Sequence, residues 1–189
     1  MTDPLLYMKI REGKISNTFG MVRTNTDGTL KPHQGWDLQA NLCTQVFAVA
    51  KGTIVWTRAD DGVSDYGNQV LLAFSGQYVN GAPLYGPFQQ FFAFYAHLTS
   101  FIVKPGQLVE EGELIASTGQ SGNAGNTPPH LHFEIRSTDS QTPGTGLGSR
   151  IDPATFLGAP PLAGRSVPGY WGPTGYIRVD DPAFLRFPR

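Results

Sequence analysis

The sequence predicts an all-β protein in which an antiparallel sheet carries a groove-forming second layer. Two observations lead to this prediction. Runs of β-branched and aromatic residues are short and end at turn residues, as in strands joined by tight connections. The chain also has 23 glycines and 15 prolines but only 15% charged residues, and it shows no heptad pattern. We therefore expect strands and turns rather than long helices.

Five segments have the composition of strands, because β-branched and aromatic residues dominate them and turn residues flank them. They cover residues 53–57, 69–74, 91–96, 113–118 and 130–136. One short helical turn is expected at residues 152–157, where Asp152 can cap the turn and Pro153 occupies its first position. The predicted order is therefore strand after strand, with a single short helix near the end.

Length and charge limit the classes of protein and partner. A chain of 189 residues suits one domain with a real core. The formal net charge of −1 gives no basis for binding a nucleic acid or a membrane surface. No apolar run approaches the roughly 20 residues that cross a bilayer. We expect no nucleic-acid partner and no membrane insertion.

Cys43 is the single cysteine, so an internal disulfide is impossible, and we expect it to be a small, half-buried apolar residue. Residues 1–9 lack the basic start, the apolar stretch and the cleavage site of a signal peptide. The prediction is that this chain carries no signal peptide.

The four histidines lie in two short motifs and at one position between them. His33 and Asp37 form an HxxxD pattern, His130 and His132 form an HxH pattern, and His97 lies between the two. Side chains alternate along a strand, so His130 and His132 point the same way. Catalytic zinc takes three protein ligands and keeps one position for water. The spacing therefore predicts a mononuclear zinc site that hydrolyses a peptide or amide bond.

The motifs around these residues resemble those of the lysostaphin/LytM-type zinc metallopeptidases, which cut peptide cross-links in bacterial cell walls. The likeness extends over residues 9–157. Two departures are Gln45 before Val46, where the family has proline, and the loop at residues 126–129 before the HxH motif. The matching stretches are residues 15–23, 46–55, 66–70, 95–98, 103–107, 118–122 and 130–134.

The resemblance implies a role for each motif residue. His33, Asp37 and His132 would be the ligands of one Zn²⁺ per chain, and His97 and His130 the catalytic pair beside it. Residues 1–157 would form the catalytic domain, and residues 158–189 an extension rich in proline, glycine and aromatic residues that packs on it.

The implied function is a zinc-dependent endopeptidase that hydrolyses peptide cross-links of peptidoglycan, with the D,D type favoured. Such an enzyme acts in the periplasm or cell wall. Without a signal peptide, an antibacterial effector or a lysin reaches the wall of a target cell by signal-independent secretion, and an effector would need a cognate immunity protein. Two alternatives stay open: a catalytically silent module that binds the wall or regulates a hydrolase, and a zinc amide hydrolase or carboxypeptidase acting on another wall bond.

Several other residues have two readings each. Residues 76–88 are either a surface loop or a wall of the groove, and Tyr66 and Tyr95 either line the groove or belong to the core. Glu134 either supports a metal ligand or serves solubility at a sheet edge.

The acidic residues Asp60, Asp61 and Asp65 lie in one short segment, and a solvated turn is favoured there over a calcium loop. In the extension we expect the aromatic residues to pack, since they are costly to leave in water. They are Tyr170, Trp171, Tyr176, Phe184 and Phe187.

Overall fold

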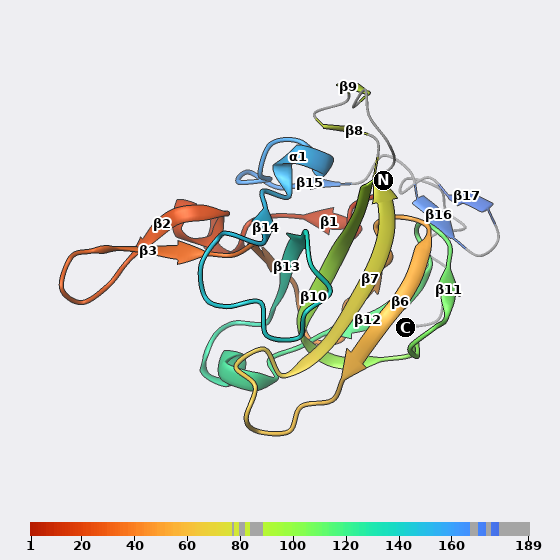
Figure 1. The fold of residues 1–189 in the computed structure, drawn as a ribbon. Helices are drawn as coiled ribbons and strands as arrows, with labels where there is room; N and C mark the ends of the chain where they lie inside the picture. The colour runs from red at the N-terminus through yellow and green to blue at the C-terminus, as the bar shows by residue number, and fades with distance from the viewer. Residues whose placement is uncertain (77, 80–81, 84–88, 167–169, 173–174, 178–189) are drawn as a thin grey trace.

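The computed structural model describes residues 1–76, 78–79, 82–83, 89–166, 170–172 and 175–177. Its main element is an antiparallel sheet of nine strands, which confirms the predicted all-β class (Figure 1). Within the described ranges, no helix has the length and apolar character that crossing a membrane requires.

Strand β10 is the centre of this sheet, and its two ends have different neighbours. One edge pairs with β7 along most of its length, while the other edge pairs first with β13 and then with β12. Beyond β7 the order continues to β6 and β11, beyond β12 to β5, and beyond β13 to β4 and β14. The strands are β4 (Trp36–Gln39), β5 (Gln45–Phe47), β6 (Gly52–Arg58), β7 (Asn68–Gly76), β10 (Gln89–Phe101), β11 (Leu108–Val109), β12 (Leu114–Thr118), β13 (His130–Arg136) and β14 (Arg150–Ile151).

Smaller elements surround the sheet. Strands β2 and β3 form a hairpin that projects from the body of the molecule (Figure 1). The remaining elements are β1 (Tyr7–Met8), which pairs with β15 (Arg165–Ser166); β2 (Gly20–Thr24); β3 (Leu30–His33); β8 (Tyr78–Val79), which pairs with β9 (Ala82–Pro83); β16 (Tyr170–Gly172), which pairs with β17 (Gly175–Ile177); the 3₁₀ turns η1 (Arg11–Gly13), η2 (Ile15–Asn17) and η3 (Gly122–Asn126); and α1 (Ala154–Leu157).

The five predicted strands are confirmed: four of them match or lie within β6, β7, β10 and β13, and the fifth matches β12, which begins one residue later than predicted, at Leu114. The helical turn is also present, but it begins at Ala154. Pro153 already has helical φ and ψ, and the Ala154 amide donates to Asp152 Oδ1 over 2.9 Å. Asp152 thus caps the turn as its position suggested.

The sheet has one face toward the main core and one toward a polar cavity. On β13, Leu131, Phe133 and Ile135 belong to the main core, so the residues between them face the other way. A smaller apolar cluster that includes Trp56 and Phe94 underlies this second face. The alternation therefore gives β13 a fully buried polar row, which consists of His130, His132, Glu134 and Arg136.

The two tyrosines with open assignments have different surroundings. Tyr95 is fully buried in the main core, and its hydroxyl accepts a hydrogen bond from the Val49 amide over 3.0 Å. Tyr66 is half-buried and lines the cavity. Tyr95 is a core residue, and Tyr66 is a groove residue.

The prediction for Cys43 was wrong, because this residue is exposed. It lies in the connection between β4 and β5 with φ of 62°, a left-handed conformation, and its amide donates to Thr118 O. The tight turn, rather than the apolar character of the thiol, decides where the side chain points.

The first residues of the C-terminal extension contact the N-terminal segment. The Ile10 amide donates to Pro161 O over 2.9 Å, Arg165 Nη2 lies 2.9 Å from Asp3 Oδ1, and Leu162 packs against the main core. Two expectations stay predictions, because most of the residues concerned lie outside the described part of the chain. One is the packing of the aromatic side chains of the extension, and the other is a groove wall built by residues 76–88.

Candidate metal centre

Three of the predicted site residues bring their donor atoms together on the polar face. His33 Nε2 lies 3.2 Å from Asp37 Oδ1 and 3.3 Å from His132 Nδ1, and His132 Nδ1 lies 2.9 Å from Asp37 Oδ1. All three side chains are at most 5% exposed. The potential ligand atoms of the three residues lie within 4.8 Å of one another.

Sheet register explains why residues so far apart in sequence meet here. Asp37 on β4 is the direct partner of His132 on β13, so their side chains share one face. His33 ends β3 and is separated from β4 by the bend at Gln34 and Gly35. The chain is extended on both sides of this bend, so His33 and Asp37 reach one site across a turn rather than along a helix.

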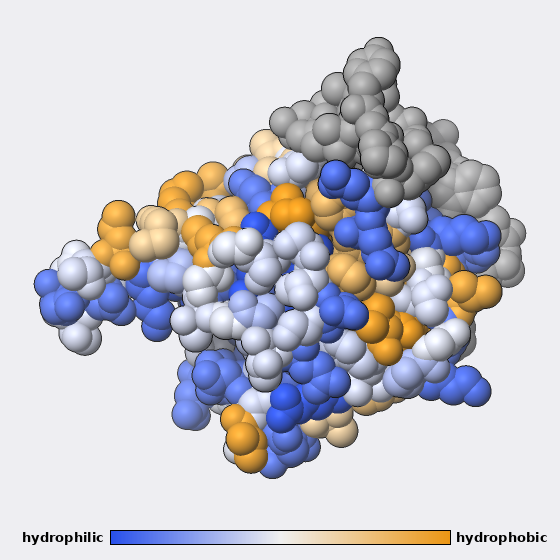
Figure 2. All heavy atoms as spheres, in the orientation of Figure 1, coloured by the Kyte–Doolittle hydropathy of each residue, from blue (hydrophilic) through white to orange (hydrophobic). Residues whose placement is uncertain are grey.

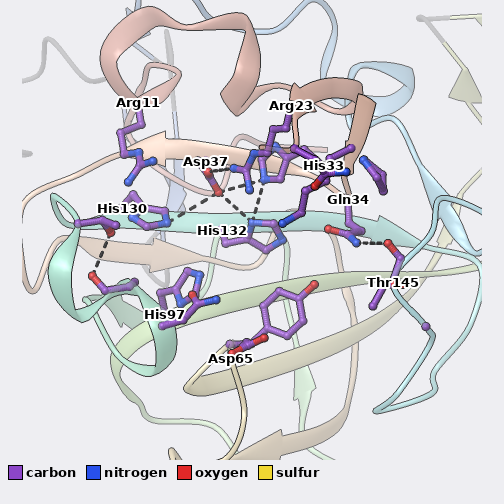
Figure 3. A pocket seen from close by; sticks show the side chains of 18 residues that line it. Arg11, Arg23, His33, Gln34, Asp37, Asp65, His97, His130, His132 and Thr145 are labelled. Atoms are coloured by element: carbon purple, nitrogen blue, oxygen red, sulfur yellow. Dashed lines mark hydrogen bonds and ion pairs between the residues drawn. The ribbon is translucent and has the colours of Figure 1, made fainter. Parts of the chain in front are cut away.

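His97 reaches the same face through an irregularity in β10. Regular alternation would place it on the core side with Tyr95, but the pairing with β7 shifts between Tyr95 and Leu98, and His97 has φ of 58°. A non-glycine residue in this conformation is strained, and such strain concentrates at functional sites. Figure 3 shows the result, with His97 beside His130 below the strand. Their ring centroids are 4.9 Å apart.

Backbone carbonyls orient three of the four imidazoles. The Nδ1 of His33 contacts Thr18 O at 2.9 Å, that of His97 contacts Ser121 O at 2.9 Å, and that of His130 contacts Pro128 O at 3.0 Å. A carbonyl oxygen only accepts, so each Nδ1 must donate, and in the neutral ring Nε2 keeps its lone pair. Burial is the main cause that lowers the pKa of all three, that of His97 to about 3.

The fourth imidazole, that of His132, is oriented by the carboxylate of Glu134. Its Oε1 accepts from His132 Nε2 at 2.9 Å and from the Tyr66 hydroxyl at 3.1 Å, and its Oε2 accepts from Arg136 Nε at 2.6 Å and Arg150 Nε at 3.2 Å. The carboxylate is 0% exposed, so the sheet-edge solubility reading is wrong. Burial would raise the pKa of Glu134, but His132 and Arg136 outweigh it and lower that pKa strongly.

Arg23 forms an ion pair with Oδ2 of Asp37, the oxygen that points away from the histidines. Its Nη2 lies 2.5 Å from Asp37 Oδ2, while Oδ1 faces His33 and His132. Burial would raise the pKa of Asp37, but the hydrogen bonds from His132 and His33 hold it well below its usual value. No role for Arg23, Arg136 or Arg150 is predictable from the sequence, because only the fold shows which arginine meets which carboxylate.

The acidic turn behaves as a structural element. Asp60 and Asp61 are exposed, Asp61 pairs with Arg58 at 2.6 Å, and Asp60 Oδ2 accepts from the Gly122 amide at 3.0 Å. The exposure of Asp60 and Asp61 agrees with the expected solvated turn, and the Gly122 contact joins this turn to η3.

A cavity of about 490 Å³ surrounds the cluster (Figure 3). On the face drawn in Figure 2, hydrophobic residues form only small, separated groups. The cavity is lined by Arg11, Arg23, Asn25, Lys31, Pro32, His33, Gln34, Asp37, Asp65, Tyr66, His97, Asn123, Ala124, Thr127, His130, His132, Gly144 and Thr145.

The donor set has the chemistry that zinc requires. Two imidazole nitrogens and one carboxylate oxygen converge, each ring is fixed through its second nitrogen, and the cavity leaves room for water. The residues therefore fit a catalytic zinc ion with three protein ligands.

A family model, peptidase family M23, matches residues 31–143, which is more than half of the chain. The chain belongs to peptidase family M23. M23 enzymes are zinc metallopeptidases, so the family agrees with the donor set found here.

Curated M23 relatives differ in their described roles. The chain is 32% identical over 130 residues to an uncharacterized metalloprotease of Haemophilus influenzae, covering 68% of this chain and 24% of that protein. It is 33% identical over 104 residues to the peptidoglycan DD-endopeptidase ShyA of Vibrio cholerae, covering 55% and 20%. It is 29% identical over 125 residues to the murein hydrolase activator NlpD of Escherichia coli, covering 66% and 26%. The chain thus spans about a quarter or less of the length of these relatives.

Solved M23 structures have the same fold. A zinc-containing peptidase from Vibrio cholerae aligns with a TM-score of 0.54 at 25% identity, over 79% of this chain and 37% of that chain. The catalytic domain of lysostaphin from Staphylococcus simulans aligns with a TM-score of 0.51 at 27% identity, over 76% and 90%. The lysostaphin-like catalytic fold predicted from the motifs is therefore confirmed.

Proposed function

We propose that this M23 domain is a zinc-dependent endopeptidase that hydrolyses peptide cross-links of peptidoglycan, of the D,D type. The observation that carries the proposal is the convergence of His33, Asp37 and His132 beside two further histidines in one cavity. Similarity to a protein described as a peptidoglycan DD-endopeptidase supports the choice of substrate.

In this proposal His33 Nε2, His132 Nδ1 and Asp37 Oδ1 hold the metal. Bound zinc supplies a water of lowered pKa, about 7, and polarises the scissile carbonyl. Arg23 keeps Asp37 oriented through Oδ2, and Glu134 fixes His132 so that Nδ1 faces the cavity. The ligand geometry is thus set before substrate arrives.

His97 and His130 move the protons in this proposal. Burial favours the neutral form of each ring, and because Nδ1 donates to a carbonyl, Nε2 is the unprotonated nitrogen. Both rings line the cavity beside the metal ligands. One ring accepts the proton of the attacking water, and a protonated ring returns a proton to the leaving amine. Groups of this kind typically contribute about 10²–10⁴-fold to the rate.

Mass spectrometry of products from purified cell walls tests this function. Walls with direct D-Ala–meso-diaminopimelate cross-links and walls with glycine bridges are digested by the zinc-loaded chain, before and after chelation. We expect products cut at the cross-link from the first wall type, loss of cleavage on chelation, and recovery with zinc. A zinc-loaded protein that releases nothing from either wall would refute the proposal.

Two variants separate ligands from proton-transfer groups. His97→Ala and His130→Ala should retain one zinc per chain by metal analysis while the cleavage rate falls by about 10²–10⁴-fold. A near wild-type rate in either folded variant removes that histidine from the mechanism.

A regulatory module is the second candidate, since the chain is also similar to a murein hydrolase activator. The complete set of converging donor atoms favours the hydrolase. Stimulation of a separate wall hydrolase by Asp37→Ala, combined with no cleavage by the wild type, would favour the activator. The wall products also separate an endopeptidase from an amidase or a carboxypeptidase, because each leaves different ends.

Action in the periplasm or cell wall of a target cell and a cognate immunity protein stay predictions. Growth of a test bacterium after periplasmic expression and after cytoplasmic expression tests the predicted place of action. Toxicity limited to the periplasm is expected, and equal toxicity in both compartments would contradict it.

A further inference from the structure

Arg11 is placed on the wall of the catalytic cavity by its neighbour in the chain. Ile10 forms an antiparallel bridge with Leu38, and both are fully buried in the main core. Arg11 follows Ile10 and Asp37 precedes Leu38, so both come next to this bridge on the cavity side. Figure 3 shows Arg11 directed toward His130, and both residues line the cavity.

Within the residues that the structure describes, the guanidinium of Arg11 makes no hydrogen bond or ion pair, and its only attraction is to the exposed carboxylate of Glu12 beside it in the chain. The Nε of Arg11 is buried without a hydrogen bond. Nearby carboxylates are already engaged: Glu12 pairs with Lys14 at 2.9 Å, and the two oxygens of Asp37 face Arg23 and the histidines. An unpaired, partly buried charge is costly, so its place beside the catalytic histidines calls for a ligand of opposite charge.

The backbone that carries Arg11 is held on both sides. Asn17 Nδ2 donates to Arg11 O over 2.8 Å, and the preceding amide, that of Ile10, donates to Pro161 O over 2.9 Å. A guanidinium on a fixed backbone presents its donors in a planar fork that matches a carboxylate. This arrangement suits recognition of a carboxylate close to the reacting bond.

We propose that Arg11 binds a free carboxylate on the substrate residue that supplies the scissile nitrogen. The inference rests on the proposed function and deepens it by assigning the residue that recognises the substrate. In a D-Ala–meso-diaminopimelate cross-link, the carbon attached to the scissile nitrogen also carries a free carboxylate, whereas a glycine–glycine bond inside a bridge offers none. Binding this group beside His130 places the leaving nitrogen next to a proton donor.

The test compares two synthetic cross-linked peptides that differ in one group. One carries the free carboxylate on the diaminopimelate carbon next to the scissile nitrogen, and the other carries a carboxamide there. Cleavage is measured with the zinc-loaded chain and with Arg11→Gln and Arg11→Lys. Binding of both peptides is measured by calorimetry on His97→Ala and on the same variant carrying Arg11→Gln.

Lys31 on β3 provides a matched control. It is an exposed cation that lines the same cavity, so Lys31→Gln removes the same charge from another wall. We expect Arg11→Gln to raise KM for the carboxylate peptide by about 10- to 100-fold, as for loss of hydrogen bonds to a charged group. The carboxamide peptide should be little affected, Arg11→Lys should be intermediate, and Lys31→Gln should leave the preference between the peptides unchanged.

The outcomes separate this inference from the proposed function. Loss of carboxylate preference in Arg11→Gln, with the melting temperature and zinc content retained, supports it. Equal handling of the two peptides by the wild type, an unchanged preference in both Arg11 variants, an equal loss in Lys31→Gln, or no binding of either peptide overturns it. Arg11-dependent binding of the carboxylate peptide without any cleavage supports the inference and refutes the endopeptidase function.

Discussion

Replacing Glu134 by glutamine tests whether the buried charge cluster behind His132 holds the site together. The carboxylate accepts from four donors, two on each oxygen, and therefore uses its full capacity. The glutamine amide has the same shape, but one of its two oxygens is replaced by an NH₂ group, which donates. Depending on its orientation, this NH₂ group faces either the two arginines or His132 and Tyr66, all of which are donors. The substitution also leaves Arg136 and Arg150, each 1% exposed, without a counter-charge.

The expected cost is large compared with the stability of a domain. Breaking a buried ion pair by removing one partner costs about 3–5 kcal/mol. Whole domains are stable by only about 5–15 kcal/mol. Loss of a group that orients a metal ligand typically weakens metal binding by about 10- to 100-fold. We therefore expect Glu134→Gln to lower the free energy of unfolding by about 3–5 kcal/mol and to weaken zinc binding within that range.

Urea unfolding and zinc competition against a chelator measure the two effects. Glu110→Gln is the control, because Lys51 Nζ lies 2.7 Å from Glu110 Oε1 while both side chains are at least 70% exposed. Exposed pairs of this kind contribute little, so the control should leave both measurements unchanged. An unfolding midpoint and zinc affinity in Glu134→Gln equal to those of the control would refute the reasoning.

Three further predictions concern the metal, the sheet and the extension. Asp37→Ala should lose bound zinc together with activity, and metal analysis showing one zinc per folded chain would exclude Asp37 as a ligand. Gly35→Ala should destabilise the fold by about 1–3 kcal/mol and reduce zinc content, since a Cβ would collide with the β13 backbone. Gly146→Ala, where a Cβ meets open space, is its control in urea unfolding. Removal of residues 159–189 should lower the melting temperature more than truncation after Ser166, which keeps the described contacts. Equal melting temperatures for the two truncated chains would show that these contacts do not stabilise the domain.

Local patterns were sufficient to predict the strands and the polar row on β13. Alternation is a property of any extended chain, so the HxH motif alone placed His130 and His132 on one face, and the next position on that face belongs to Glu134. The short apolar runs likewise predicted β6, β7 and β10, because strand composition depends on a few neighbouring residues. The motifs also led to the family that the comparisons confirm.

Only the tertiary structure decided the contacts between distant segments. The β4–β13 register places Asp37 opposite His132, and the shift in β10 turns His97 onto the cavity side against simple alternation. Both depend on pairing between residues far apart in the sequence, which a local pattern does not contain. The partners of the arginines also depend on the tertiary structure, because the sequence does not show which charged groups come close together. The fold gives Arg23 the carboxylate of Asp37, whereas Arg11 receives no hydrogen bond or ion pair from the described part of the chain.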